Sequence, residues 1–185
     1  MVKLPQIIQG GMGVGVSNWR LARSVSLLGH LGVVSGVALA VILARRLQLG
    51  DPDGSMRRAL AAFPMQDVAK RTLSRYYIAG GKDPGQPFVL LAFPSAAASP
   101  ELDDLTVLAN FAEVWLAKES NPGLVGINYL EKVQLPTLPS LYGAMLAGVD
   151  VVLMGAGIPR YIPEVLDRLA AGEPAQLKLT VGGAR

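Results

Sequence analysis

The sequence contains no cysteine and only one histidine, His30, among its 185 residues. Without cysteine the chain can form no disulfide and has no thiol nucleophile, and a cytoplasmic location is expected. His30 is expected in a surface turn before a strand, so it provides no Ser-His-Asp set. Because His, Asp and Glu are not grouped at metal-ligand spacing, no metal site is expected either.

Charged residues are also scarce, at 17%, whereas hydrophobic residues make up 51%. This balance is typical of an α/β domain with buried parallel strands. The net charge of +3 comes from basic residues interleaved with acidic ones, with few aromatic residues nearby, so no nucleic-acid partner is expected. The uncharged stretch 27–44 is interrupted by Gly29, Gly32 and Gly36, and no membrane span is expected.

Apolar runs alternate with helical stripes along the chain, which predicts about five βα units of an α/β fold. Strands are expected at 5–9, 31–35, 124–130, 149–154 and 177–181. The helices between them are expected at 18–28, 38–49, 99–116, 139–147 and 163–171. Residues 50–99 break this order with two predicted helices, 56–63 and 66–77, and an extended piece at 87–93. That region is far longer than an ordinary βα connection, so we interpret it as a helical insertion, serving as a lid or an oligomer contact.

Residues 5–17, PQIIQGGMGVGVS, combine a short apolar strand, a glycine-rich loop and Ser17, the expected N-cap of the first helix. Glycines there let the backbone approach a ligand closely, and the helix N-terminus offers N–H groups to an anion. Neither the GxGxxG nor the GxxxxGK[ST] nucleotide pattern fits this loop. A tight turn with small residues for packing is the alternative interpretation.

The same segment resembles the start of the nitronate monooxygenase (2-nitropropane dioxygenase) family, whose first strand reads approximately P-I-I-Q-x-x-M-x-x-x-V-S. The matching residues are Pro5, Ile7, Ile8, Gln9, Met12, Val16 and Ser17. Gly10-Gly11 replaces the family's usual Ala-Pro, as in a long bacterial branch allied to the trans-acting enoyl reductases of polyketide systems. The resemblance implies a TIM (β/α)8 barrel. A complete barrel needs about 250 residues, so this chain would hold only its N-terminal part.

Two later segments are similar to strand ends of the same family. Gly126-Ile-Asn128 resembles a G-V-N strand end whose asparagine contacts FMN, and residues 151–159, VVLMGAGIP, resemble V-V-x-x-x-x-G-[IL]-P. An asparagine that only caps a strand end, and a small-residue turn before a helix, are the alternatives. The FMN-binding residues implied by the resemblance are Gly10, Gly11, Met12, Gly13, Ser35, Asn128 and Gly155.

The resemblance implies an FMN-dependent oxidoreductase that oxidises alkyl nitronates with O₂. The family's catalytic base is a histidine in a later G-G-H segment, expected beyond Arg185, so no catalytic residue is named here. A flavin-dependent enoyl reductase-like protein is one alternative. A non-catalytic half-barrel that acts as a scaffold is another, and open strand edges would favour a homo-oligomer.

Overall fold

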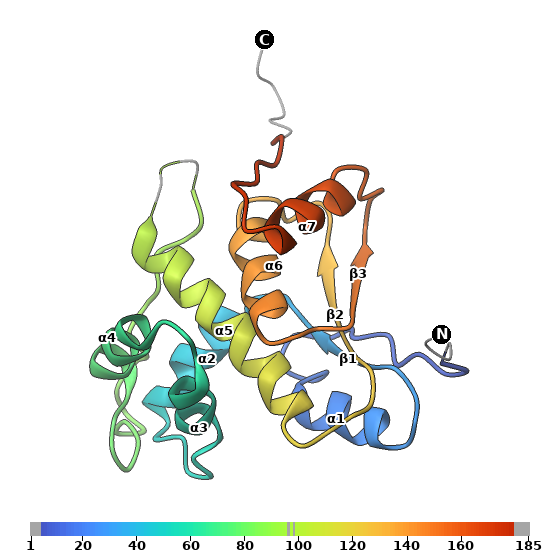
Figure 1. Ribbon diagram of the computed structural model, residues 1–185. Helices are drawn as coiled ribbons and strands as arrows, with labels where there is room; N and C mark the ends of the chain where they lie inside the picture. The colour runs from blue at the N-terminus through green and yellow to red at the C-terminus, as the bar shows by residue number, and fades with distance from the viewer. Residues whose placement is uncertain (1–4, 96, 98, 180–185) are drawn as a thin grey trace.

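The computed structural model describes residues 5–95, 97 and 99–179 (Figure 1), and over these residues the chain is a mixed α/β structure. Within these residues a three-stranded parallel sheet is accompanied by seven helices, which pack on one of its faces or on one another. In chain order the elements are α1 (Trp19–Leu27), β1 (Gly32–Ser35), α2 (Leu39–Gln48), α3 (Ser55–Ala62), α4 (Gln66–Tyr76), α5 (Pro100–Lys118), β2 (Val125–Leu130), α6 (Thr137–Leu146), β3 (Val151–Gly155) and α7 (Ile162–Ala170). The predicted α/β class is therefore confirmed.

The sheet follows the order of the chain: β1 pairs with β2, and β2 pairs with β3, both in parallel. Ser35 of β1 lies opposite Asn128 of β2, which in turn lies opposite Leu153 of β3. Because side chains alternate along a strand, these three residues share one face of the sheet. Strands that follow one another in the sequence therefore lie side by side in the sheet, with no reversal of the strand order.

The two faces of the sheet have different coverings. Val34, Ile127 and Tyr129 point into the main core beneath the helices, and we call this side the helix face. Gly32 lies on the same side, where an added Cβ would meet the backbone of Ala22 in α1 at 1.8 Å. The opposite side, here called the loop face, is partly covered by the glycine loop. Its residues include Val33, Ser35, Gly126, Asn128, Leu130, Val151, Leu153 and Gly155.

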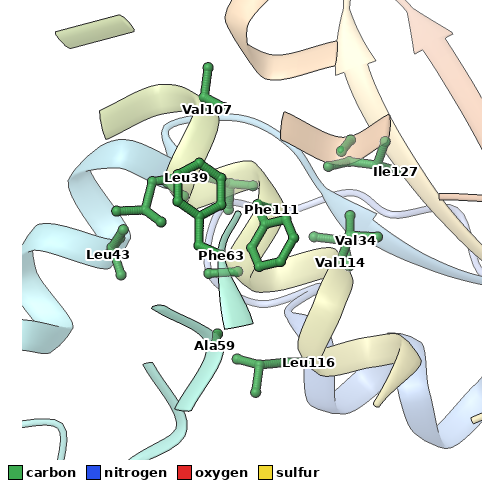
Figure 2. Packing of buried hydrophobic residues seen from close by; sticks show 14 of the residues in the cluster. Val34, Leu39, Leu43, Ala59, Phe63, Val107, Phe111, Val114, Leu116 and Ile127 are labelled. Carbon is green, nitrogen blue, oxygen red and sulfur yellow. The ribbon is translucent and has the colours of Figure 1, made fainter. Parts of the chain in front are cut away.

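Helix α5 is the centre of the core. Apolar residues lie all around it and residues 105–114 are buried without a break, because α1, α2, α3 and α6 all pack against it. The rings of Phe63 and Phe111 meet edge to face, with their centroids 5.0 Å apart (Figure 2). Gly143 of α6 lies so close to α5 that an added Cβ would be 2.1 Å from the carbonyl oxygen of Val107. The stability of the fold is therefore concentrated on the helix face.

The first predicted strand, 5–9, is not a strand. It is reduced to a single parallel bridge between Ile8 and Leu31, with Gln9 N–H donating to Leu31 O at 3.0 Å. The next N–H of the ladder, that of Val33, donates to the side-chain Oε1 of Gln9 at 2.9 Å instead of to a backbone carbonyl. The side chain of Gln9 thus ends the pairing and turns the chain into the loop.

The last predicted strand, 177–181, is also wrong over residues 177–179, which belong to no strand, while 180 and 181 lie outside the described residues. Leu177 packs back against the core cluster instead of extending the sheet. Residues 87–93 are described without strand pairing, whereas the two helices predicted within 50–99 are present as α3 and α4. Because Met56, Leu60 and Phe63 are fully buried, this region contributes to the core. Its interpretation as an insertion stays a prediction.

No helix in the described part of the chain combines the length and the apolar character that a membrane crossing needs.

Candidate functional site

The glycine loop is fixed by the two polar side chains at its ends. Gln9 Nε2 donates to Ser17 Oγ at 3.1 Å, and Ser17 Oγ donates to Met12 O at 2.5 Å. Ser17 was predicted to cap the first helix, and that prediction is wrong. Asn18 is the N-cap, because its Oδ1 accepts from the backbone N–H groups of Arg20 and Leu21. The hydroxyl of Ser17 is used inside the loop instead.

The amino end of α1 offers no free site for an anion. Asn18 occupies two of its backbone N–H groups, and the first one, that of Trp19, donates to Glu113 Oε2 at 2.9 Å. Glu113 is buried and paired with Arg46. Its burial raises the pKa of the carboxyl group, and the Arg46 charge and the Trp19 N–H oppose that rise. The expectation that this helix would bind an anion is therefore wrong, because the position is taken by the chain's own carboxylate.

Asn128 joins β2 to the glycine loop. Its Nδ2 donates to Gly10 O at 2.8 Å and lies 3.5 Å from Met12 Sδ. Both partners are acceptors, which sets the orientation of the amide. Its Oδ1 is then left buried, with no hydrogen-bond partner among the described residues. An unpaired buried oxygen of this kind is uncommon in folded proteins and marks this position.

Gly11 brings the loop backbone against the loop face of the sheet. Its φ is +64°, and an added Cβ would lie 2.4 Å from Val33 Cγ1 and 3.1 Å from Asn128 Cβ. No other residue fits this close approach without displacing its neighbours. Sequence reasoning thus placed Gly10, Gly11, Met12 and Asn128 together correctly, across more than 110 positions of the chain.

The other expected residues lie around this cluster. Ser35 is buried, lies opposite Asn128 in the sheet, and its N–H donates to Ser17 O at 2.8 Å. Gly13 is exposed at the far end of the loop, where its carbonyl accepts from the N–H groups of Val16 and Ser17. Gly155 ends β3 opposite Leu130, one strand away, and accepts from Glu131 N–H at 2.8 Å. Gly155 is thus the most distant member of the expected set along the sheet.

Gln9 is the residue of this cluster that the sequence-based list of binding residues left out. It matched the family pattern, but only the structure shows its amide bonding at both ends, to Val33 N–H and to Ser17 Oγ. A polar residue directly after two β-branched ones, at the carboxyl end of a strand, was the available signal. His30 is half-buried just before β1, at the opposite end of the sheet from the Asn128 cluster, as expected. Within the described residues, no group of three or more His, Asp or Glu is arranged to hold a metal ion.

Comparisons with protein-family models, with curated protein sequences and with solved structures find no match for this chain. Its function must therefore be argued from its own residues.

Proposed function

We propose that this chain forms the N-terminal part of a (β/α)8 barrel and binds the ring of FMN at the carboxyl ends of β1 and β2, as part of a flavin-dependent oxidoreductase. The parallel, sequential strand order supports the barrel. So does the packing of α1 and α5 on the helix face only, because a doubly wound sheet carries helices on both faces. In the barrel, the loop face would be the interior and the Asn128 cluster would lie at the catalytic end.

The unpaired Oδ1 of Asn128 is the observation that carries the proposal. Leaving a buried acceptor without a partner costs about 1–3 kcal/mol, which a bound donor would recover. An oxidised flavin ring presents one N–H among several acceptors, and Asn128 would accept from it. Met12, with an exposed fraction of 64%, lies against the same amide and is the side chain that would move aside. The glycine backbone then allows a flat ring to lie close to the sheet.

The residues present fit the ring of FMN but give no site for its phosphate at α1. The N–H groups that would bind a phosphate are bonded to Asn18 and Glu113, and the Glu113 carboxylate would repel a second anion. We therefore propose that neither the glycine loop nor α1 binds the phosphate of FMN. FMN and riboflavin should accordingly bind this chain with similar affinity, since the phosphate adds no contact here.

Bound FMN would supply the redox chemistry, taking electrons from an alkyl nitronate and passing them to O₂. The residues of this chain would orient the ring: Asn128 through its free oxygen, Gly11 by allowing close approach, and Gln9 by holding the loop. None of the hydrogen bonds described in this cluster involves an ionisable side chain, so the catalytic base is not assigned.

Flavin fluorescence titration of this chain tests the proposal. We expect weak, saturable quenching by the protein with riboflavin and FMN alike, and a loss of about 1–3 kcal/mol of binding free energy in Asn128→Ala. Gln176→Ala removes an exposed amide elsewhere and should leave the titration unchanged. Absence of saturable binding, or equal dissociation constants for the parent chain and Asn128→Ala, would contradict the assignment.

A non-catalytic scaffold is the second candidate, and one observation favours it. The Nδ2 of Asn128 and the whole amide of Gln9 are engaged in holding the loop on the sheet, which a purely structural strand end also requires. In that case Asn128→Ala should lower the thermal stability of the chain, and flavin should bind neither to the parent chain nor to this variant. A flavin-dependent enoyl reductase-like protein would use the same ring site but would pass electrons from the flavin to its substrate, so an assay of substrate turnover distinguishes it.

A further inference from the structure

A separate cavity of about 420 Å³ lies at the carboxyl ends of β1 and β2, towards the helix face. Its walls are the turn from Gly36 into α2, the beginnings of α5 and α6, and the extended residues 88–94, which we call the strap. In Figure 1 the strap runs in light green towards the amino end of α5. Tyr129 of the cavity wall points to the helix face, whereas Asn128 points to the loop face, and the residues of the Asn128 cluster do not line this cavity.

The polar groups in the cavity wall are already bonded to one another. Tyr129 Oη lies 2.8 Å from Asn110 Oδ1 and 2.9 Å from Ser140 O. Asn110 Nδ2 donates to Thr106 O at 2.9 Å, and Thr106 Oγ1 donates to Leu102 O at 2.7 Å. The rest of the lining is mostly aliphatic or aromatic. An occupant therefore gains nothing from polar atoms in the interior, and hydrocarbon is the chemistry that fits.

The strap exposes apolar side chains at the cavity to an unusual degree. Leu90 is 84% exposed and Phe93 is 91% exposed, although both line the cavity. The strap is attached through Val89, whose N–H donates to the buried Gln48 Oε1 at 2.7 Å, and through Leu91, which packs on the core. Exposed apolar residues that gather around a cavity mark a ligand site, because a bound apolar molecule would remove them from water.

One end of the cavity is positively charged. The guanidinium of Arg45 lies 5.2 Å from the ring centroid of Phe88, and Lys82 Nζ lies 4.9 Å from the same ring. Arg45 lines the cavity, is exposed and forms no ion pair with the described residues, whereas the adjacent Arg46 is paired with Glu113. An unpaired guanidinium beside an apolar cavity provides a partner for a carboxylate.

We propose that this cavity binds an unbranched alkyl carboxylate, with the hydrocarbon chain inside and the carboxylate on Arg45. The volume lies within the range of small-molecule sites, about 300–1,000 Å³. The assignment is independent of the flavin proposal, since the two sites use different residues. It also gives the strap a role, because the hydrocarbon of the bound carboxylate would cover Leu90 and Phe93.

Isothermal titration calorimetry of this chain with saturated carboxylates of six to sixteen carbons, each below its micelle concentration, tests the site. Each added methylene should tighten binding about fourfold until the cavity is full, after which affinity should stop rising. A primary alcohol of the best length should bind about tenfold more weakly, and an alkyltrimethylammonium ion more weakly still. Absence of binding across the series, or an affinity that does not change with the number of carbons, would overturn the proposal.

Variants separate the two halves of the site. Arg45→Gln should weaken the best carboxylate about tenfold and leave the alcohol unchanged, while Arg160→Gln, which removes an exposed charge elsewhere, should change neither. Ala40→Trp fills the cavity from the first turn of α2, and Val133→Trp fills it from the segment after β2. At least one of these should fold, as judged by its melting curve, and should bind no carboxylate of ten or more carbons. If a folded filling variant binds as tightly as the parent chain, the ligand lies elsewhere and the proposal is wrong.

Discussion

On the helix face of β1 and β2, Val34, Ile127 and Tyr129 are buried under packed helices, whereas on the loop face of β2 Asn128 and Leu130 remain partly exposed. In β3, at the edge of the sheet, the residues on both faces are partly exposed. Both faces belong to the same three strands, so the difference comes from what covers them. The helix face is covered by long amphipathic or fully apolar helices, and the loop face by a glycine loop of a few residues. The first arrangement stabilises the fold, and the second leaves the surface accessible to another group.

Polar side chains show the same contrast. On the helix face, Asn110 and Glu113 are buried, and their side chains are bonded to Thr106, Tyr129, Trp19 and Arg46. On the loop face, Asn128 has a bonded nitrogen and an unpaired oxygen. Two other buried side-chain atoms, Trp19 Nε1 and His30 Nδ1, also lack a partner among the described residues. It is therefore the place of the Asn128 oxygen, beside the glycine loop, that indicates a position kept for another partner.

The largest expected effect tests where the stability lies. Phe63 is 1% exposed and packs on Phe111, so Phe63→Ala should lower the free energy of unfolding by about 3–5 kcal/mol. Phe93→Ala removes an equal side chain from the strap, where it is 91% exposed, and should change stability by less than about 0.5 kcal/mol. Urea denaturation followed by circular dichroism measures both. Similar losses for the two variants would show that the strap is part of the stable core.

A somewhat smaller loss is expected at the buried carboxylate. Glu113→Ala leaves Arg46 unpaired and the Trp19 N–H unbonded, which should cost about 2–4 kcal/mol, below the usual 3–5 for a buried pair because Arg46 is partly exposed. Glu113→Gln retains an acceptor for Trp19 and should cost less.

The same carboxylate predicts a pH dependence. Burial raises the pKa of Glu113 in the folded chain, so the native state holds the proton more tightly than the unfolded state. The contribution of this group to stability should therefore fall as the pH rises from the unfolded pKa towards the raised native pKa. Denaturation of the parent chain and of Glu113→Gln at a series of pH values measures the contribution of this carboxyl group to stability. A difference that grows in the parent's favour with rising pH would have the opposite sign and would contradict the raised pKa.

The two asparagines, Asn110 and Asn128, provide a further test with a smaller expected effect. Asn110→Ala removes the partner of Tyr129 Oη inside the core and should cost about 1–3 kcal/mol. Asn128→Ala breaks one bond to Gly10 but also removes the unpaired oxygen, so the net loss should stay below about 1 kcal/mol. Thermal melts of the two variants compare them. A larger loss at Asn128 would mean that its side chain serves the fold rather than a ligand.

The elements that the sequence predicted well are those whose own residues carry a clear apolar pattern. Helices α1 to α7 appear within a few residues of their expected bounds, and so do the three strands, because each has its own apolar stripe or run. The failures are at 5–9, where the Gln9 side chain takes the place of the next backbone bond to β1, and at 177–179, which belong to no strand. Pairing depends on what lies beside a strand, and the pattern of one segment does not contain that information.

The candidate site was predictable in part, because strand order places strand ends together. The contact of Gly10 and Met12 with Asn128 follows from a parallel sheet, in which carboxyl ends meet at one edge. The occupation of the α1 terminus by Glu113 was not predictable, since Trp19 and Glu113 are 94 positions apart and no local pattern links them. The cavity beside the strap was missed because residues 88–94 carry no periodic signal.

The smallest expected change of stability concerns two adjacent residues of β3. Leu153 lies on the loop face, where a lysine can extend its charged end into water, so Leu153→Lys should change the free energy of unfolding by about 0.5 kcal/mol or less. Val152 packs against the core on the helix face, and Val152→Lys should cost clearly more.

If the loop face is the interior of a barrel, it will also attract apolar surfaces of other copies. Size-exclusion chromatography should then show that the parent chain self-associates and that Leu153→Lys shifts it towards a monomer. Equal destabilisation by both lysines, with no change in elution, would show that the two faces are covered alike.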